Sequence, residues 1–299
     1  MLLKQIFTKR LTKDSHSCSN GNTATNKEIE AAFDLMVRQM QYIAADLRYR
    51  SKLKDSMAAT LEHLKTLVNR LPEPDVDLSP DRYNEDTRFK LLFSNSRRIP
   101  EIVNQGPGMR KFFEGSANSS CYAVLWARLV SRQKLTVALE GDSLQKDVLK
   151  TQHGFSGHNI LFHSENLDGT RNRLQEHLLK LFLAEMSVSI NTEIEELIRK
   201  TFSTYGRRNR DAVLPKVREF LERASSCVSL DDFGLLVDPM GFELSEKEAQ
   251  GKATVPFQRI YTTREELGIP VMVVVPKHVV DMEKSHDFNH TLAARMFPS

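Results

Sequence analysis

The 299-residue chain has little glycine, little cysteine and no long apolar run. Its 13 glycines are about 4% of the residues, where soluble proteins average about 7%. Few positions are left for the left-handed backbone that glycine-rich phosphate-binding loops need, which argues against a large nucleotide-binding fold. Cys18, Cys121 and Cys227 form neither a disulfide framework nor a paired zinc motif, so we expect a reducing compartment and a cytoplasmic protein.

Apolar residues do not run far enough to cross a membrane. The longest stretch, IPVMVVVP at residues 269–276, has eight residues, where a spanning helix needs roughly 20. The 42 basic residues exceed the 39 acidic ones by only three, so any contact with a polyanion must be local. No Walker loop, dinucleotide fingerprint, HExxH motif or EF-hand loop is present, so we expect no cofactor and name no catalytic residue.

The first 24 residues are predicted to be a flexible basic tail. Residues 1–13 combine leucine, isoleucine and phenylalanine with four basic residues and contain no acidic residue. This pattern is also typical of a helix that contacts a membrane surface or directs organelle targeting. We prefer the tail, because an isolated helix of this length is marginal in water.

The most regular pattern of the chain follows this tail. Thr25 and Glu28 form a capping box, which predicts the start of a helix. Apolar residues then recur at spacings of three and four up to Leu71, and the repeat stays in phase through Arg50 and Lys54, which predicts one continuous helix over residues 25–71. The predicted interaction seam consists of Ile29, Phe33, Met36, Met40, Ile43, Leu47, Met57, Leu61, Leu64 and Val68.

Such a seam must be covered by another surface. Either it self-associates or docks a protein partner, as in a coiled coil, or it packs against later helices of the same chain. Arg50 and Lys54 then mark a polar layer that sets register, or the place where the packing partner ends. The sequence leaves these alternatives open.

The rest of the chain predicts an α+β fold. After a linker at 72–82, we expect an α+β region at 83–166, a helical region at 167–226 and an α+β region at 227–299, with 83–299 able to form one domain. Short stretches rich in β-branched and aromatic residues between 121 and 163 predict an antiparallel β-meander, with Trp126 in its core.

The later helices and strands follow from local signals. Residues 170–202 predict two helical pieces, because Asn191 and Thr192 offer a second helix start. A further helix is predicted over 211–224, with Pro215 in its first turn. Beyond it we expect a DPMG hairpin turn, a strand at FQRIY, a short helix at TTREELG, a buried strand at VMVVV and a closing helix at 283–297.

The strongest local charge lies between Arg199 and Arg223, where eight basic residues face three acidic ones, a balance of 8 − 3 = +5. Arginines with a neighbouring aromatic ring are typical of a loop that contacts phosphates and stacks on a base. RNA, single-stranded DNA or an anionic head group would fit, although a solvated charged surface explains the same residues. The candidate binding residues are Tyr205, Arg207, Arg208 and Arg210.

Several polar residues could belong to a metal site or a catalytic site, but none of them forms a complete motif. His153, His158 and His163 invite a metal site, yet on one continuous strand His158 and His163 would face opposite sides unless a bulge brings them together. HGFSGH departs from a nucleophile elbow, because His158 stands where the motif needs glycine. The pairs His286 with His290, Glu140 with Asp142, and Asp231 with Asp232 supply two candidate ligands each without a third.

The sequence therefore favours a non-catalytic interaction, scaffold or regulatory protein that uses the N-terminal helix to self-associate or dock a partner. One alternative is nucleic-acid or anionic-ligand binding through the basic patch at 199–223. A second alternative is a metal-dependent hydrolase that uses the central histidines, although no metal site is named.

Overall fold

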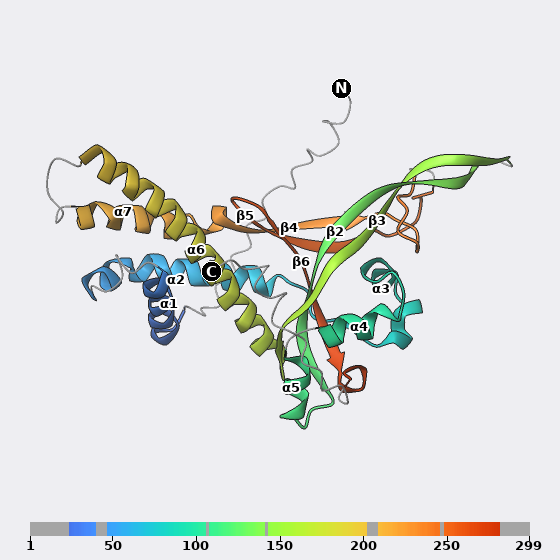
Figure 1. Cartoon of the computed structure of the whole chain (residues 1–299), viewed down its shortest axis with the longest axis horizontal. Coiled ribbons are helices and arrows are strands. Elements are labelled where there is room, and N and C mark those ends of the chain that lie inside the picture. The colour runs from blue at the N-terminus through green and yellow to red at the C-terminus, as the bar shows by residue number, and fades with distance from the viewer. Residues whose placement is uncertain are drawn as a thin grey trace.

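A computed structural model describes residues 24–39, 47–105, 108–140, 143–201, 209–245 and 248–281. Side chains at 47–48, 138–145, 193–201 and 209–213 are not described. Helices pack on both sides of one sheet whose long strands are antiparallel, which confirms the α+β class (Figure 1). In the described part of the chain, no helix has both the length and the apolarity required to span a bilayer.

The sheet has the strand order β3-β2-β6-β5-β4, and β1 pairs in parallel with β6. β6 contains the predicted valine-rich stretch and is buried along most of its length, because helices lie over both of its faces. The strands are β1 (Val76–Asp77), β2 (Ser120–Glu140), β3 (Ser143–Ser164), β4 (Val228–Leu235), β5 (Val255–Thr262) and β6 (Glu266–Pro276).

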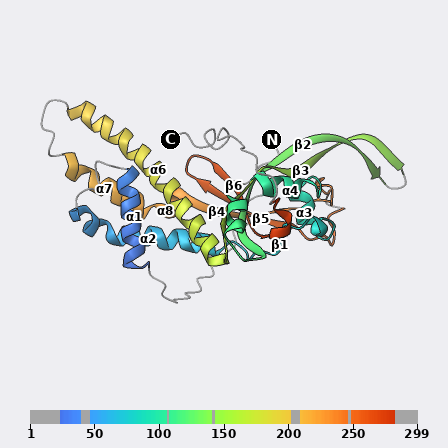
Figure 2. The same cartoon turned by 60° about the horizontal axis from the view of Figure 1, so that its bottom comes forward.

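The helices divide into two groups. The first group covers one face of the sheet and consists of α1 (Asn26–Gln39), α2 (Leu47–Asn69), α6 (Leu167–Thr201), α7 (Asn209–Glu222) and α8 (Ala224–Cys227). The second group lies on the other face and consists of α3 (Thr87–Leu92), α4 (Arg98–Gln105) and α5 (Met109–Glu114), as Figure 2 shows. Two short 3₁₀ helices, Pro80–Asn84 and Lys277–Val279, lie in the connections.

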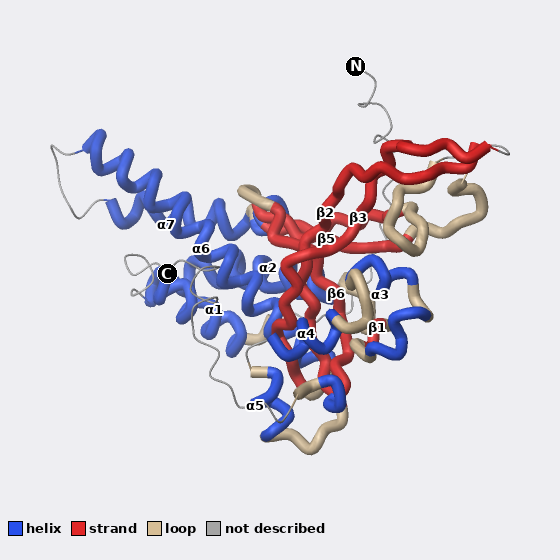
Figure 3. Tube along the Cα trace, turned by 45° about the vertical axis from the view of Figure 1, so that its right-hand side comes forward, coloured by secondary structure: helices blue, strands red, loops and turns tan. Residues whose placement is uncertain are grey.

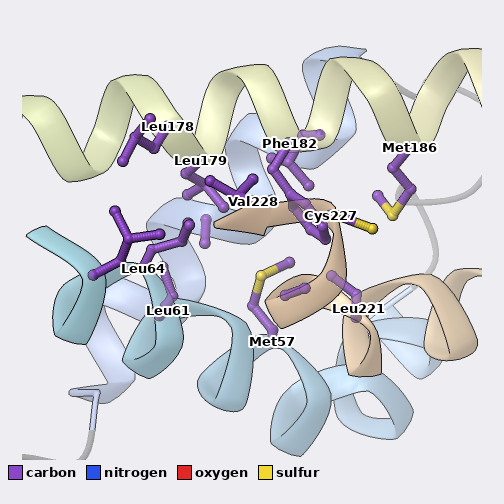
Figure 4. Packing of buried hydrophobic residues seen from close by; sticks show 14 of the residues in the cluster. Met57, Leu61, Leu64, Leu178, Leu179, Phe182, Met186, Leu221, Cys227 and Val228 are labelled. Atoms are coloured by element: carbon purple, nitrogen blue, oxygen red, sulfur yellow. The ribbon is translucent and has the colours of Figure 1, made fainter. Parts of the chain in front are cut away.

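Each face of the sheet therefore has its own hydrophobic core. On β2, Val124 belongs to the core under the first group and the next residue, Leu125, belongs to the core under the second. This alternation is what a strand covered on both faces requires. Figure 4 shows the first core, where Met57 and Leu64 of α2 meet Phe182 of α6 and Leu221 of α7.

The structure does not confirm one continuous helix over 25–71. The capping box is present, with the Thr25 amide donating to Glu28 at 2.7 Å, but α1 ends at Gln39 and α2 begins at Leu47. Arg50 forms ion pairs with Glu30 at 2.8 Å and Asp34 at 2.7 Å. Sixteen residues of a straight helix would rise about 24 Å, so the prediction is corrected to two helices folded against each other.

The predicted linker at 72–82 also contributes to the fold. β1 lies within it, and both Val76 and Leu78 are fully buried in the second core. The short helices α3, α4 and α5 follow it, and Pro100 lies in the first turn of α4, where the missing N–H costs no helical hydrogen bond. This half of the sheet is therefore covered by α3–α5 and by the chain that leads into them.

The predicted meander is instead one long hairpin. β2 and β3 pair from Tyr122↔Ser164 to Glu140↔Ser143 without the predicted intermediate turns. The glycine-rich HGFSGH segment lies inside β3, where Gly157 has a φ of +64° beside a register shift. Trp126 is partly buried against the first core, and its ring N–H donates to the Leu267 carbonyl at 3.0 Å.

Three local helix predictions are corrected. α6 is continuous, because the Thr192 hydroxyl donates back to the Val188 carbonyl at 2.9 Å instead of capping a new helix. Pro215 is the seventh residue of α7 and not in its first turn. TTREELG forms the end of β5, a turn at 263–265 and the start of β6, and the Thr262 amide donates to the Glu265 carbonyl at 2.8 Å. The predicted closing helix at 283–297 lies outside the described residues.

Candidate functional site

The far half of the β2–β3 hairpin projects from the rest of the sheet (Figures 1 and 3). Pairing of β2 with β6 ends at Ala127↔Ile269, whereas pairing with β3 continues to Glu140↔Ser143. We call residues 128–140 and 143–156 the arm. Figures 1 and 3 show this two-stranded ribbon extending well beyond the rest of the sheet.

One face of the arm is cationic. From Arg128↔Ser156 to Thr136↔Val148 the two strands stay in register, so alternate residues point to the same side. Arg128, Arg132 and Lys134 therefore share one face, and all three are exposed. At about 3.4 Å per residue, Arg132 lies about 14 Å from Arg128 and Lys134 about 7 Å farther along the strand.

These three charges have no ion-pair partner among the described residues. Lys150, directly opposite Lys134, differs because its ammonium group lies 3.0 Å from a carboxylate oxygen of Glu248. No described arm side chain on this face is acidic. The result is a row of uncompensated positive charge on a narrow ribbon, a distribution that attracts anions.

The opposite face is apolar toward its tip. Leu135 and Leu149 are directly opposed across the two strands, and Val137 follows Leu135 on the same side of β2. Their side chains are 66%, 62% and 56% exposed. Nearer to the sheet, Leu129 and Phe155 of the same face pack against the second core. Farther toward the tip, no described residue of the arm belongs to either core.

A strap of chain holds the base of the arm. The His153 amide donates to the Gly241 carbonyl at 2.8 Å, and the Glu243 amide donates to the Thr151 carbonyl at 2.9 Å. The turn that presents these groups is the predicted DPMG turn, in which Asp238 accepts hydrogen bonds from two backbone amides and Gly241 has a φ of +84°. We call residues 236–245 and 248 the strap.

The predicted interaction seam is covered within the chain wherever its side chains are described. Figure 4 shows Met57, Leu61 and Leu64 facing α6 across the first core. Ile29, Phe33, Met36 and Val68 are buried in the same core, whereas Met40 and Ile43 lie outside the described residues and the side chain of Leu47 is not described. Arg50 pairs within the chain and Lys54 is exposed, so neither forms the predicted polar layer.

The predicted basic binding site falls on residues whose side chains the structure does not describe. Tyr205, Arg207 and Arg208 lie outside the described residues, and only the backbone of Arg210 is described, near the start of α7. Asp142, His286 and His290 also lie outside the described residues, and the side chain of Glu140 is not described. Asp231 and Asp232 are exposed on β4, where Asp232 pairs with Arg70 at 2.8 Å.

The central histidines do not converge. A bulge at Phe162, whose φ is +58°, does bring His158 and His163 toward the same layer of helices. Their rings nevertheless have different partners: His158 stacks on Phe93 and donates to the Leu92 carbonyl at 2.6 Å, whereas His163 meets Phe112 edge-on. Burial lowers the pKa of both rings. Both are therefore packing residues of the second core.

His153 lies on the arm, where its Nδ1 is 2.9 Å from the Ser131 hydroxyl. Ser156 is exposed on β3 and pairs with Arg128 across the strands. Within the described ranges, no group of three or more His, Cys, Asp or Glu residues is arranged to hold a metal ion. The described geometry thus offers no support for the hydrolase alternative.

The arm residues were missed by the sequence analysis, although a signal for them exists. In RLVSRQKLTV, which begins at Arg128, basic residues occupy even-numbered positions and large aliphatic residues occupy odd-numbered ones near the tip. This period of two predicts a ribbon with one cationic face and one apolar face. Comparison of the chain with protein-family models, curated proteins and solved structures gave no match.

Proposed function

We propose that this protein is a non-catalytic nucleic-acid-binding protein that contacts the phosphate backbone through the cationic face of the arm. The observation that carries the proposal is the row of Arg128, Arg132 and Lys134 on one face of a projecting ribbon, with no described ion-pair partner. The proposal takes up the nucleic-acid alternative of the sequence analysis, but it moves the contact from residues 199–223 to the arm. The helix seam, which the leading hypothesis needed as a docking surface, is covered within the chain wherever its side chains are described.

The dimensions of the arm support a nucleic-acid partner. The major groove of DNA is about 12 Å wide and admits a two-stranded ribbon. The separations of about 7 Å and about 14 Å between the three cations correspond to the rise of about two and about four nucleotides along the axis of a duplex, at 3.4 Å per nucleotide of one strand. Arginine and lysine at these positions can therefore contact several phosphates of one backbone.

The separation of charge and apolar surface argues against a membrane as the partner. Surface-binding elements insert apolar side chains while basic residues at the same interface meet the head groups. On the arm, Leu135 and Leu149 point away from the side that carries Arg132 and Lys134. A ribbon inserted through its leucines would turn its cations away from the lipid, so the geometry favours nucleic acid.

The test is fluorescence anisotropy with a short DNA duplex, a single strand of the same length and acidic lipid vesicles, between about 50 and 200 mM salt. Replacing Arg128, Arg132 and Lys134 with alanine is expected to weaken nucleic-acid binding at least tenfold at low salt. Each lost phosphate contact should also flatten the dependence of log affinity on log salt by about 0.9.

The matched control replaces Lys27, Lys52 and Lys54 with alanine, which removes the same charge from exposed positions on α1 and α2. This variant should bind within about twofold of the wild type, since its sites lie off the arm. A third variant replaces Arg207, Arg208 and Arg210. The proposal is wrong if no nucleic acid binds, if only vesicles bind, or if this third variant loses binding while the arm variant retains it.

A further inference from the structure

The outer edge of β2 in the arm has no neighbouring strand in the described structure. Pairing of β2 with β6 ends at Ala127↔Ile269, and beyond that pair β2 is bonded only to β3. The outer edge of β3, in contrast, is occupied by the strap. We call the unpaired side of β2, over residues 128–137, the open edge.

The hydrogen bonds of the strap show which residues of β2 face the open edge. The His153 amide and the Thr151 carbonyl both bond to the strap, so these residues turn their backbone groups away from β2. Ser131 and Gln133 lie directly opposite them and therefore turn their own amides and carbonyls toward the open edge. The alternation of the strand gives residues 129 and 135 the same orientation.

The backbone of the open edge offers both kinds of hydrogen-bonding group. Residues 129, 131, 133 and 135 each present an amide N–H and a carbonyl there, and no hydrogen bond of the described structure uses these groups. Phosphate oxygens only accept hydrogen bonds, so nucleic acid leaves the carbonyls without a donor. An added β-strand pairs with both groups, which is how the edges of sheets bind extended peptides.

The side chains beside the open edge specify the charge of the partner strand. Arg128, Arg132 and Lys134 share one face of β2, so alternate residues of an added strand would lie beside them, where opposite charges stabilise a cross-strand pair. No residue of the open edge is acidic. The carboxylates of Glu243 and Glu248 belong to the strap, which lies beyond β3. This face therefore favours a strand with acidic residues at alternate positions.

The other face of the open edge is uncharged on β2 itself. It carries the exposed Leu135 and Val137 toward the tip, and a serine and a glutamine nearer to the sheet. Lys146 and Asp147 lie opposite Val137 on β3, one strand farther from the open edge. Aliphatic or hydroxyl residues of the added strand match this face.

A second copy of the arm does not match the open edge. Antiparallel pairing of two open edges keeps the same face of both ribbons on the same side. The cations of one copy would then lie beside those of the other, which destabilises the pairing.

We propose that the open edge binds an extended acidic peptide segment of a partner protein as an added β-strand, with its acidic side chains beside Arg128, Arg132 and Lys134. The proposal goes beyond nucleic-acid binding and does not depend on it. If both proposals hold, peptide and nucleic acid compete, because they use the same three cations.

The probe is a fluorescently labelled peptide of sequence Ile-Glu-Thr-Glu-Thr-Val-Thr-Glu. In antiparallel pairing its isoleucine lies beside Leu135 and its glutamates lie beside Lys134, Arg132 and Arg128. Fluorescence anisotropy is expected to show saturable binding that weakens as salt is added. The same peptide with lysine in place of glutamate should bind at least about tenfold more weakly.

Methylated peptides separate strand pairing from charge attraction. In this register the amides of the threonines face the open edge and those of the glutamates point away. N-methylation of the threonines should therefore weaken binding at least about tenfold, whereas N-methylation of the glutamates should change it less than about threefold.

Ser131→Pro removes one amide from the open edge, and Ser131→Ala is its matched control. Both variants lose the contact between the Ser131 hydroxyl and His153, so the difference between them reports the amide. Proline is tolerated where the N–H of an edge strand faces solvent, and the melting temperature checks the fold. Ser131→Pro should bind the peptide at least about tenfold more weakly than Ser131→Ala, and DNA within about threefold of it, because the cations remain.

Amide hydrogen exchange of the wild type, followed by NMR, gives a readout that needs no variant. The peptide should slow exchange at Ser131 and Gln133 and leave Arg132, whose amide faces β3, nearly unchanged. No peptide binding up to about 1 mM would overturn the proposal. Equal binding of the threonine-methylated peptide, or binding without this alternating protection, would overturn it as well. The DNA titrations of the arginine and lysine variants test nucleic-acid binding separately.

Discussion

At the scale of single residues, Glu185 is the least compensated charge in the first core. Its side chain is 8% exposed on α6, and its Oε2 atom has no hydrogen-bond partner among the described residues. Its other carboxylate oxygen is 3.9 Å from the Arg264 guanidinium, which is too long for a hydrogen bond. Burial raises the pKa of Glu185, and Arg264 opposes that shift only in part.

We expect Glu185→Gln to stabilise the protein at neutral pH. The folded pKa lies above the unfolded one, so the benefit of protonation is present in acid and is lost as the pH rises through the folded pKa. At pH 7 the gain in unfolding free energy should not exceed about 1 kcal/mol, since solvent screens part of the effect. Urea unfolding at pH 4 and pH 7 measures it. The control is Glu176→Gln, 60% exposed on the same helix; a variant less stable than the wild type at pH 7 would refute the expectation.

At the scale of elements, the sequence predicted correctly those features that have a local or periodic signal. The capping box at Thr25 and the buried valines of β6 were both predicted, because each signal is local or periodic. The repeat of three and four could not distinguish one long helix from two paired ones, since both arrangements bury the same periodic positions. The sequence analysis divides the arm into several short strands. Its polar residues, such as Arg132, face water on a ribbon that no helix covers, and in the sequence they therefore resemble turn residues.

The strap is an element whose contribution can be measured. Glu248 accepts hydrogen bonds from the Ser245 amide and hydroxyl and from Lys150 of the arm, which lower its pKa to about 2. The ion pair is thus present above the unfolded pKa and is lost only as the pH falls through about 2. At pH 7 it ties the strap to the arm, although the exposed site keeps the effect small.

Glu248→Gln is expected to loosen the base of the arm without unfolding the protein. Hydrogen exchange at the amides of His153 and Glu243, which bond across the strap, should accelerate roughly two- to fivefold, as the loss of one exposed ion pair implies. The global melting temperature should not change. Glu73→Gln, at another exposed position, is the control and should leave these amides as in the wild type. Unchanged exchange in Glu248→Gln would mean that the strap is held by its backbone alone.

At the scale of the whole molecule, one sheet is shared by two cores. β2 comes from the region at 83–166 and pairs with β6 from the region at 227–299, so segments far apart in the sequence form neighbouring strands. Sequence analysis could propose these regions but not their order in the sheet, because strand pairing depends on contacts distant in the chain. Val124 and Leu125 lie next to each other on β2 and pack into different cores. Loss of either core should therefore disturb the strand that supports the other.

This arrangement predicts one cooperative unfolding transition. Phe182→Ala in the first core and Phe113→Ala in the second each remove a fully buried ring, and each should lower the unfolding free energy by about 3–5 kcal/mol. In both variants, helix loss by circular dichroism and fluorescence of Trp126 should shift together, since β2 joins the cores. Val188→Ala, at an exposed position, should change stability by less than about 0.5 kcal/mol. Two separated transitions in Phe113→Ala, with only one of them shifted, would show that the cores unfold independently despite the shared strand.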